Sequence, residues 1–156
     1  MLRFVNHKSI LAAVASTLVL CMLGGARAQD EQTILGPGMY VFQTRTRSAT
    51  CGDDERTGYV STFVAPIHGV PGSRTMRMQL LNSPYFATWT ITVNAEMQVI
   101  GDSTQTGQSS PNAPTNHFEV SRRRDRFVGT GVRRYRSGGR ECEVHFDALL
   151  RQIDLL

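Results

Sequence analysis

The sequence predicts an all-β protein whose single domain is an antiparallel up-and-down barrel of about eight strands. Short runs of β-branched and aromatic residues recur along the chain, and Gly, Pro, Asn and Ser separate them. No segment keeps a helical periodicity for longer than a turn or two. The last three runs alternate apolar and polar residues regularly enough to place both turns between them. A two-sheet β-sandwich is the alternative architecture.

The first 28 residues are predicted to be a secretory signal peptide. Arg3 and Lys8 form a basic start, residues 10–23 are apolar and uncharged, and Ala26-Arg27-Ala28 fits a small-x-small cleavage site. The apolar run is shorter than the roughly 20 residues that a bilayer span needs. Cleavage is therefore favoured over a retained anchor, no stable membrane span is expected afterwards, and the predicted location is periplasmic or secreted.

Cleavage of the signal peptide would lower the net charge of the chain. The whole chain carries a formal net charge of +4. Loss of Arg3, Lys8 and Arg27 leaves 14 arginines, no lysine and 13 acids, a net charge of +1. The basic balance belongs mostly to the signal segment, and it gives no support to a nucleic-acid partner.

After the signal peptide we expect an N-terminal tail at residues 29–37, a barrel domain at 38–151 and a C-terminal tail at 152–156. Residues 29–35 are expected to be loose. The eight predicted strands are residues 38–48, 58–65, 74–81, 86–93, 96–101, 117–123, 126–136 and 140–151. The only long connection, residues 102–116, is polar and contains proline.

The last two strands have a testable register. A two-residue turn at Gly138-Gly139 pairs Tyr135 with Cys142 and Arg133 with Val144. It also pairs Gly131 with Phe146, so a glycine faces a large ring as a tapering interior requires. Apolar residues then share one face, while on the other face Arg136 meets Glu141, Arg134 meets Glu143 and Thr130 meets Asp147.

A second turn at Arg124-Asp125 leads to the same inner surface. It pairs Phe118 with Gly131, Val120 with Gly129 and Arg122 with Phe127. Upstream, Trp89, Ile91 and Val93 share one face of the fourth strand, and Met76, Met78 and Leu80 share one face of the third. The first two strands carry apolar groups on both faces, so their orientation stays open.

Two cysteines remain after signal cleavage, and an exported chain with an even number predicts a disulfide between Cys51 and Cys142. Cys51 follows the first strand and Cys142 begins the last. In a closed barrel these two positions meet at the seam between first and last strands. The predicted bond therefore favours a small lipocalin-like or avidin-like barrel.

Catalysis is not favoured, because no GxSxG, HExxH, P-loop or GxGxxG motif is present. Of His68, His117 and His145, His68 lies in a turn without a visible partner, and His145 alternates outward and is interpreted as a surface residue. No metal or cofactor is expected. The acidic triplet at residues 53–55 is interpreted as a solvated turn in preference to a calcium loop. The basic turn at residues 122–126 is either solvated or faces an anionic partner such as lipid headgroups, a glycan or an acidic protein.

The candidate site is Arg133, Tyr135 and Trp89. The register directs Arg133 inward, where a guanidinium needs an anion or hydrogen-bond acceptors. Trp89 and Tyr135 belong to the same barrel end and are expected to form its walls. The leading hypothesis is a non-enzymatic barrel that binds a small amphiphile with an anionic group. The alternative is a protein-interaction module, such as an inhibitor or an envelope accessory protein, and an enzyme is less favoured.

Overall fold

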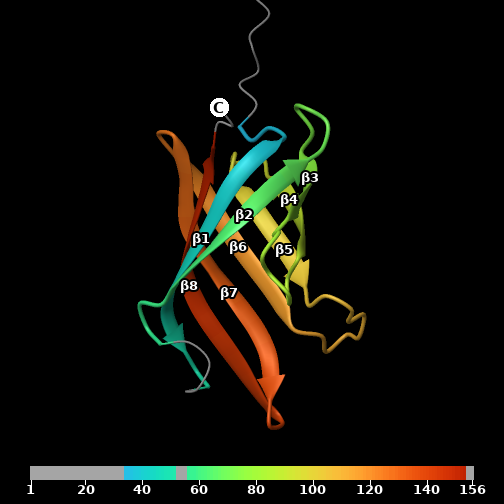
Figure 1. Cartoon of the computed structure of the whole chain (residues 1–156), viewed down its shortest axis with the longest axis vertical. Helices are drawn as coiled ribbons and strands as arrows, with labels where there is room; N and C mark the ends of the chain where they lie inside the picture. The colour runs from blue at the N-terminus through green and yellow to red at the C-terminus, as the bar shows by residue number, and fades with distance from the viewer. Residues whose placement is uncertain (1–33, 52–55, 154–156) are drawn as a thin grey trace, which may run out of the picture. The chain divides into compact units, whose positions relative to one another are not determined.

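The computed structural model describes residues 34–51 and 56–153, and these form a closed eight-stranded antiparallel barrel (Figure 1). The predicted signal peptide and the acidic triplet lie outside the described residues. The strands follow one another in chain order, and β8 pairs with β1. They are β1 (Gly38–Ala49), β2 (Val60–His68), β3 (Thr75–Gln79), β4 (Thr88–Val93), β5 (Val99–Thr104), β6 (Thr115–Arg123), β7 (Arg126–Ser137) and β8 (Arg140–Gln152).

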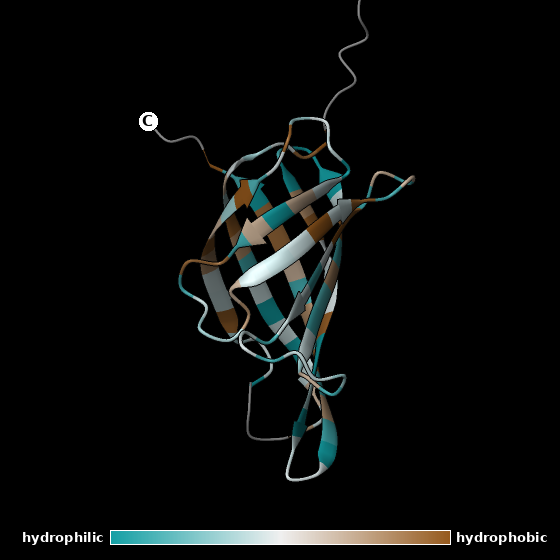
Figure 2. Ribbon diagram, turned by 90° about the vertical axis from the view of Figure 1, so that its right-hand side faces the viewer, coloured by the Kyte–Doolittle hydropathy of each residue, from teal (hydrophilic) through white to brown (hydrophobic). Residues whose placement is uncertain are grey.

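The register predicted for the last three strands is confirmed. Tyr135 pairs with Cys142, Arg133 with Val144 and Gly131 with Phe146 across β7 and β8. Across β6 and β7, Phe118 pairs with Gly131 and Arg122 with Phe127. Gly138 and Gly139 both have positive φ, 55° and 79°, as a tight turn between twisted strands requires. Hydrophilic and hydrophobic residues are mixed along the strands of the barrel (Figure 2).

The seam between β1 and β8 closes the barrel, and the predicted disulfide crosses it. Cys51 and Cys142 are bonded, with their Cα atoms 5.5 Å apart. The bond ties the end of β1 to the start of β8, next to the strand pair Ala49 and Val144. The register of this pair shifts between Thr46 and Ser48, where β1 bulges. The sandwich alternative is excluded, because no sheet edge remains between the first and last strands.

The interior settles the orientation of the first strand, which the sequence left open. Tyr40 and Phe42 are each 1% exposed and point inward. Burial raises the pKa of the Tyr40 hydroxyl, although that hydroxyl donates a hydrogen bond to the carbonyl of Gly36 at 2.9 Å. Aromatic rings fill the middle of the barrel. They decide which face of β1 points inward, because Met39 and Val41 could not make the same ring contacts.

Two glycines make room for the interior rings. A Cβ added to Gly131 would lie 2.3 Å from the ring of Phe146 and 2.5 Å from the carbonyl oxygen of His117. A Cβ added to Gly101 would lie 2.2 Å from the ring of Phe118. The expectation that glycine faces Phe146 is therefore confirmed, and β5 provides a second instance that the sequence reading did not identify.

Several element boundaries differ from the predicted ones, most of all around the fifth strand. It spans Val99–Thr104 and not residues 96–101, because Asn94 organises a turn before it. The Asn94 side-chain oxygen accepts hydrogen bonds from the backbone N–H groups of Glu96 and Gln98 at 3.0 and 2.9 Å. The following connection shrinks from residues 102–116 to residues 105–114. Leu35, expected in a loose tail, is only 2% exposed and joins the core.

The pairing of β2 with β3 is short and is completed by side chains. Only two residue pairs connect the strands, Ile67 with Met78 and His68 with Arg77. Beyond them the Asn82 amide takes the place of a strand, since it accepts from the N–H of Val64 at 3.3 Å and donates to the carbonyl of Thr62 at 3.2 Å. This exchange fastens the β3–β4 connection, residues 80–87, to the wall of the barrel.

A candidate ligand pocket at one end of the barrel

The meander places the connections at two distinct ends. The β1–β2, β3–β4, β5–β6 and β7–β8 connections share one end, which we call the pocket end. The β2–β3, β4–β5 and β6–β7 turns share the other, together with the start of β1 and the end of β8; we call it the turn end (Figure 1). The disulfide and all three predicted site residues belong to the pocket end.

A pocket of about 420 Å³ opens at the pocket end. This volume lies toward the lower limit of the roughly 300–1,000 Å³ typical of small-molecule sites. Its lining combines aromatic rings with a few polar groups. The lining residues are Phe42, Thr44, Tyr59, Ser61, Phe63, Leu80, Ser83, Pro84, Tyr85, Phe86, Trp89, Asn116, Arg133, Val144 and Phe146.

The pocket floor is an aromatic cluster that fills the middle of the barrel. The ring of Phe42 lies 4.9 Å from that of Phe118 and 5.7 Å from that of Trp89, measured between centroids. The Trp89 and Phe118 centroids are 5.3 Å apart. The indole N–H of Trp89 donates to the carbonyl of Phe86 at 2.9 Å, so burial leaves no polar atom of the indole unsatisfied. Rings therefore fill the interior at its centre, and the pocket lies beside them toward the pocket end.

Arg133 brings a positive charge into this aromatic surrounding. It is half-buried on β7, and its guanidinium carbon lies 5.5 Å from the centroid of the Tyr135 ring. Asn116 pairs with Arg133 across β6 and β7 and lines the same pocket. The Asn116 side-chain oxygen and the Tyr135 hydroxyl are both buried, and neither has a hydrogen-bond partner among the described residues.

The three predicted site residues are divided between two adjoining pockets. Arg133 and Trp89 both line the 420 Å³ pocket. Tyr135 instead lines a neighbouring, more open hollow of about 450 Å³, where Arg133 again contributes. Tyr85 and Phe86 line both spaces and separate them. Arg133 is thus the residue that the two pockets share on β7, and its role in binding stays a prediction.

The β3–β4 connection forms the outer wall of the pocket and is held at several points. Its Leu81 N–H donates to the carbonyl of Val64 at 3.0 Å. The carbonyl of Tyr85 accepts from the N–H of Thr106 at 2.7 Å, which joins this wall to the β5–β6 connection. Tyr85 nevertheless leaves 64% of its surface exposed at the rim, beside Leu81 at 60%.

Sequence reasoning missed several lining residues. Asn116 was assigned to the end of a loop, whereas it belongs to β6. Its even spacing with Phe118 and Val120, which were read as inward, is the signal that could have found it. Tyr85 falls between two predicted strands, and no local pattern reveals that this connection folds over the barrel end.

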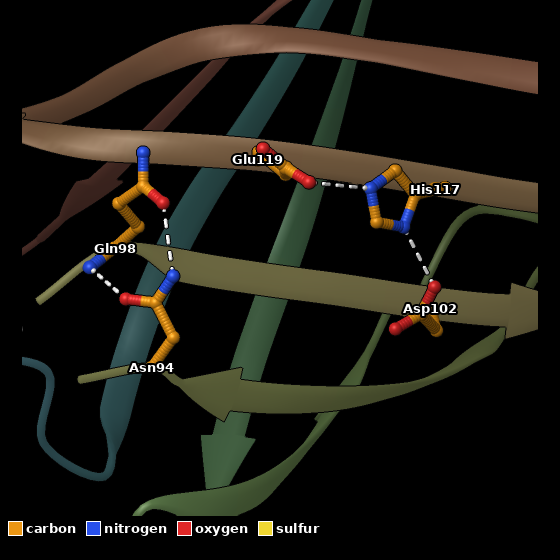
Figure 3. Close-up of polar contacts among 5 residues, drawn as sticks. All are labelled: Asn94, Gln98, Asp102, His117 and Glu119. Atoms are coloured by element: carbon orange, nitrogen blue, oxygen red, sulfur yellow. Dashed lines mark hydrogen bonds and ion pairs between the residues drawn. The ribbon is translucent and has the colours of Figure 1, made fainter. Parts of the chain in front are cut away.

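The outer wall carries a polar cluster centred on His117 (Figure 3). Its Nδ1 lies 2.7 Å from Asp102 Oδ1, and its Nε2 lies 3.3 Å from Glu119 Oε1. Partial burial alone would lower the pKa of His117, but the hydrogen bonds and charges of the two carboxylates outweigh it and raise the pKa. The cluster lies on the solvent side of β5 and β6 and lines neither of the two pockets described above.

Other candidate chemistry receives no geometric support in the described residues. No group of three or more His, Cys, Asp or Glu side chains among residues 34–51 and 56–153 is placed to hold a metal ion. The disulfide removes Cys142 as a thiol nucleophile beside His145. His145 Nε2 instead lies 3.2 Å from Glu143 Oε2 on the outer wall. Arg134 donates to the same carboxylate and, as the main cause, lowers the pKa of Glu143.

The fold and the pocket together define the class: a small, disulfide-bonded, up-and-down β-barrel with an aromatic interior and a pocket at one end. The disulfide is compatible with an oxidising compartment outside the cytosol. In the part of the chain that the structure describes, no helix is long and apolar enough to cross a membrane. No family model matches the sequence, and no curated protein or solved structure matches it significantly.

Proposed function

We propose that this protein is an exported, non-enzymatic binding barrel whose ligand is a small amphiphile with an anionic group. The observation that carries the proposal is the 420 Å³ pocket, in which an aromatic floor and Arg133 face one space. Apolar parts of a ligand gain free energy by leaving water for such a floor. An anionic group at the mouth would meet the guanidinium, which holds anions through charge-assisted hydrogen bonds.

The pocket volume also limits the ligand. Because the rings of Phe42, Trp89 and Phe118 block the centre of the barrel, a ligand reaches only the space above them. A long acyl chain would extend past the rim into water, so the proposed ligand has a short chain or a single ring. The predicted signal peptide and the disulfide support a periplasmic or secreted location, where such amphiphiles occur in solution.

Trp89 makes the proposal directly testable, because it is the only tryptophan of the chain and lies at the pocket floor. Titration with octanoate, decanoate and octyl sulfate should change Trp89 fluorescence and saturate. Octanol serves as the uncharged comparison. Arg133→Gln should weaken binding of the anions by about 10-fold or more, since a hydrogen bond to a charged group is lost, and should spare octanol.

Arg134→Gln is the matched control, since Arg134 follows Arg133 in sequence but points outward to Glu143 at 2.7 Å. It should bind every ligand as the wild type does. A fluorescence spectrum that no amphiphile changes would overturn the proposal. Equal losses in the Arg133→Gln and Arg134→Gln variants would show that long-range charge, and not the pocket, governs binding.

One observation favours a second candidate, a protein-interaction module. Tyr59, Leu81 and Tyr85 expose 57%, 60% and 64% of their surfaces around the pocket end. Exposed apolar side chains gathered at one place often mark a protein contact. Replacing Tyr59 and Tyr85 by Ser would then abolish capture of a partner from the native compartment, while octanoate binding persisted.

A further inference from the structure

The turn end of the barrel, opposite the pocket, carries a concentration of arginines. Six lie there among the described residues, against two acids, Glu96 and Asp125. The six are Arg74 before β3, Arg122 and Arg123 at the end of β6, Arg124 in the turn, Arg126 at the start of β7 and Arg151 near the end of β8. All six are exposed.

The strand register places three of these arginines in one lateral row. Arg123 pairs with Arg126, and Arg126 pairs with Arg151, so neighbouring side chains stand directly opposite across β6, β7 and β8. Like charges at such positions are about 5 Å apart at Cβ and destabilise a sheet. The nearest carboxylate oxygen among the described residues is Asp125 Oδ1, 3.9 Å from Arg126 Nε. This row contrasts with the pocket end, where Arg134 and Arg136 pair with Glu143 and Glu141.

A groove with a mixed polar and apolar lining runs along the outer wall beside the arginine row. The next outward positions toward the barrel middle are Ser121, Val128, Leu149 and Gln43, which pair in that order. They line a shallow groove of about 490 Å³, whose other lining residues are Thr44, Arg45, Arg123, Gly129, Asp147 and Ala148. Val128 and Leu149 thus place two apolar side chains next to the arginine row, among polar neighbours.

Two neighbouring turns at the same end expose apolar tips. Val70 in the β2–β3 turn is 71% exposed, and Met97 in the β4–β5 turn is 52% exposed. Met97 also has a φ of 64°, a left-handed conformation that favours glycine and costs other residues about 1 kcal/mol or more. The Asn94 and Gln98 hydrogen bonds hold this turn in place (Figure 3). A strained position that keeps a large apolar side chain in water indicates a use for that side chain.

We propose that the turn end is a docking surface for an anionic phospholipid membrane. Headgroup phosphates would neutralise the row of Arg123, Arg126 and Arg151, and Val70 and Met97 would enter the interfacial region. Basic residues near a membrane surface and shallowly inserted apolar groups attract it additively. A nucleic acid or a sulfated glycan would satisfy the arginines but leave the apolar tips, Val70 and Met97, without a role. Docking this way directs the pocket end away from the bilayer.

Vesicle co-sedimentation of the purified protein tests the proposal. Vesicles of phosphatidylcholine with 30% phosphatidylglycerol should bind the protein at low salt, and pure phosphatidylcholine should not. The triple variant Arg123→Gln, Arg126→Gln, Arg151→Gln should lower the partition coefficient by about 100-fold, since each basic residue near an anionic surface contributes about one factor of five. The triple variant Arg134→Gln, Arg136→Gln, Arg140→Gln removes the same charge from the pocket end and should cost about fivefold or less.

Thermal melts distinguish a specific loss of vesicle binding from a loss caused by misfolding. Because the arginine row is self-repulsive, the first triple variant should melt at or above the wild-type temperature while it loses vesicle binding. Met97→Gly relieves the left-handed strain and removes the apolar tip, so it too should keep or raise the melting temperature and weaken binding by about threefold or more.

Three results would overturn the proposal. Equal binding to charged and uncharged vesicles would remove the role of the arginines. Equal losses of vesicle binding in the two triple variants would show that net charge alone governs the binding. Binding to heparin or duplex DNA without binding to the anionic vesicles would identify the surface as a site for another polyanion.

Discussion

At the scale of single residues, the pocket holds a polar group that folding leaves unsatisfied. The side-chain oxygen of Asn116 is buried without a hydrogen-bond partner among the described residues. Such a group costs roughly 1–3 kcal/mol. Asn82 is the opposite case, because its amide replaces a missing strand by bonding to both Val64 and Thr62. The same residue type is therefore expected to have opposite effects at these two positions.

Asn116→Val should raise the free energy of unfolding by about 1 kcal/mol, since valine suits a strand and carries no polar atom. Asn82→Val should lower it by about 1–2 kcal/mol, because two backbone groups of β2 lose their partner. Urea denaturation followed by Trp89 fluorescence measures both changes. Destabilisation by Asn116→Val would show that the Asn116 side chain is satisfied in solution, by water or otherwise.

Gly131 and Phe146 depend on each other, because the Phe146 ring occupies the space that a side chain at position 131 of β7 would need. Gly131→Ala should destabilise the barrel by about 1–3 kcal/mol, because the new Cβ would meet both the ring and the fixed carbonyl of His117. Gly36→Ala is the control, since nothing lies within 4 Å of an added Cβ there. Thermal melts should separate the two variants; equal melting temperatures would contradict the observed contact of ring and glycine.

At the scale of elements, the ladder between β5 and β6 is reinforced on its outer side by a titratable group. His117 on β6 bonds to Asp102 on β5 and to Glu119 on its own strand. Because the folded pKa of His117 is raised, the protonated ring stabilises the fold. That contribution is fully present below the ordinary histidine pKa of about 6.5 and is lost as pH rises through the raised folded value.

The free energy of unfolding of the His117→Gln variant should therefore differ less between pH 6 and pH 8.5 than that of the wild type. The wild type should lose stability over this range relative to the variant, and the two should converge at the alkaline end. Chemical denaturation at four pH values between these limits gives the comparison. His68 and His145 are present in both proteins, so the difference between them isolates His117. Parallel pH profiles would show that the carboxylates do not favour the protonated ring in solution.

Contacts within and between elements also explain why the sequence could not place some strand boundaries. The β4–β5 turn is set by one side chain, Asn94, whose bonds to backbone N–H groups delay the start of β5 until Val99. The β2–β3 ladder contains only two residue pairs because the chain leaves β3 early and crosses the barrel end. Neither feature changes the alternation of apolar residues, so the periodicity predicted the strands but not where they begin and end.

At the scale of the whole molecule, one covalent bond fastens the seam that closes the barrel. The disulfide joins positions 91 residues apart and crosses the only pair of strands distant in sequence, β1 and β8. A cross-link over so long a loop lowers the entropy of the unfolded chain. In the chain-entropy model it adds about 4 kcal/mol to the free energy of unfolding. This is a large part of the 5–15 kcal/mol that stabilises an ordinary domain.

The double variant Cys51→Ser, Cys142→Ser should lower the free energy of unfolding by about 3–4 kcal/mol. The loss should be greatest at the pocket end, where the bond lies, so amide exchange in β8 near Cys142 should accelerate more than exchange in β5. Reduction of the wild type by dithiothreitol should reproduce the effect. A double variant as stable as the wild type would show that the strand pairing of β1 and β8 closes the barrel by itself.

The sequence by itself predicted about eight strands and the inner face of the last three, and it favoured a closed barrel over a sandwich, which the structure then excluded. Alternation has a period of two, so a single turn placed at Gly138-Gly139 assigns every residue of two strands to a face. The two remaining cysteines then located the seam. These are local or pairwise constraints, and they can be read without knowing the rest of the fold.

Only the tertiary structure decided what the barrel encloses and what its ends present. Both faces of β1 carry apolar residues. Tyr40 and Phe42 turn inward, and the Phe42 ring fills a centre that Phe118 and Trp89 share. The pocket exists because the β3–β4 connection folds over one end, and the arginine row exists because three strands are in register at the other. Both features depend on contacts between segments far apart in the chain, and packing of this kind leaves no periodic signal in the sequence.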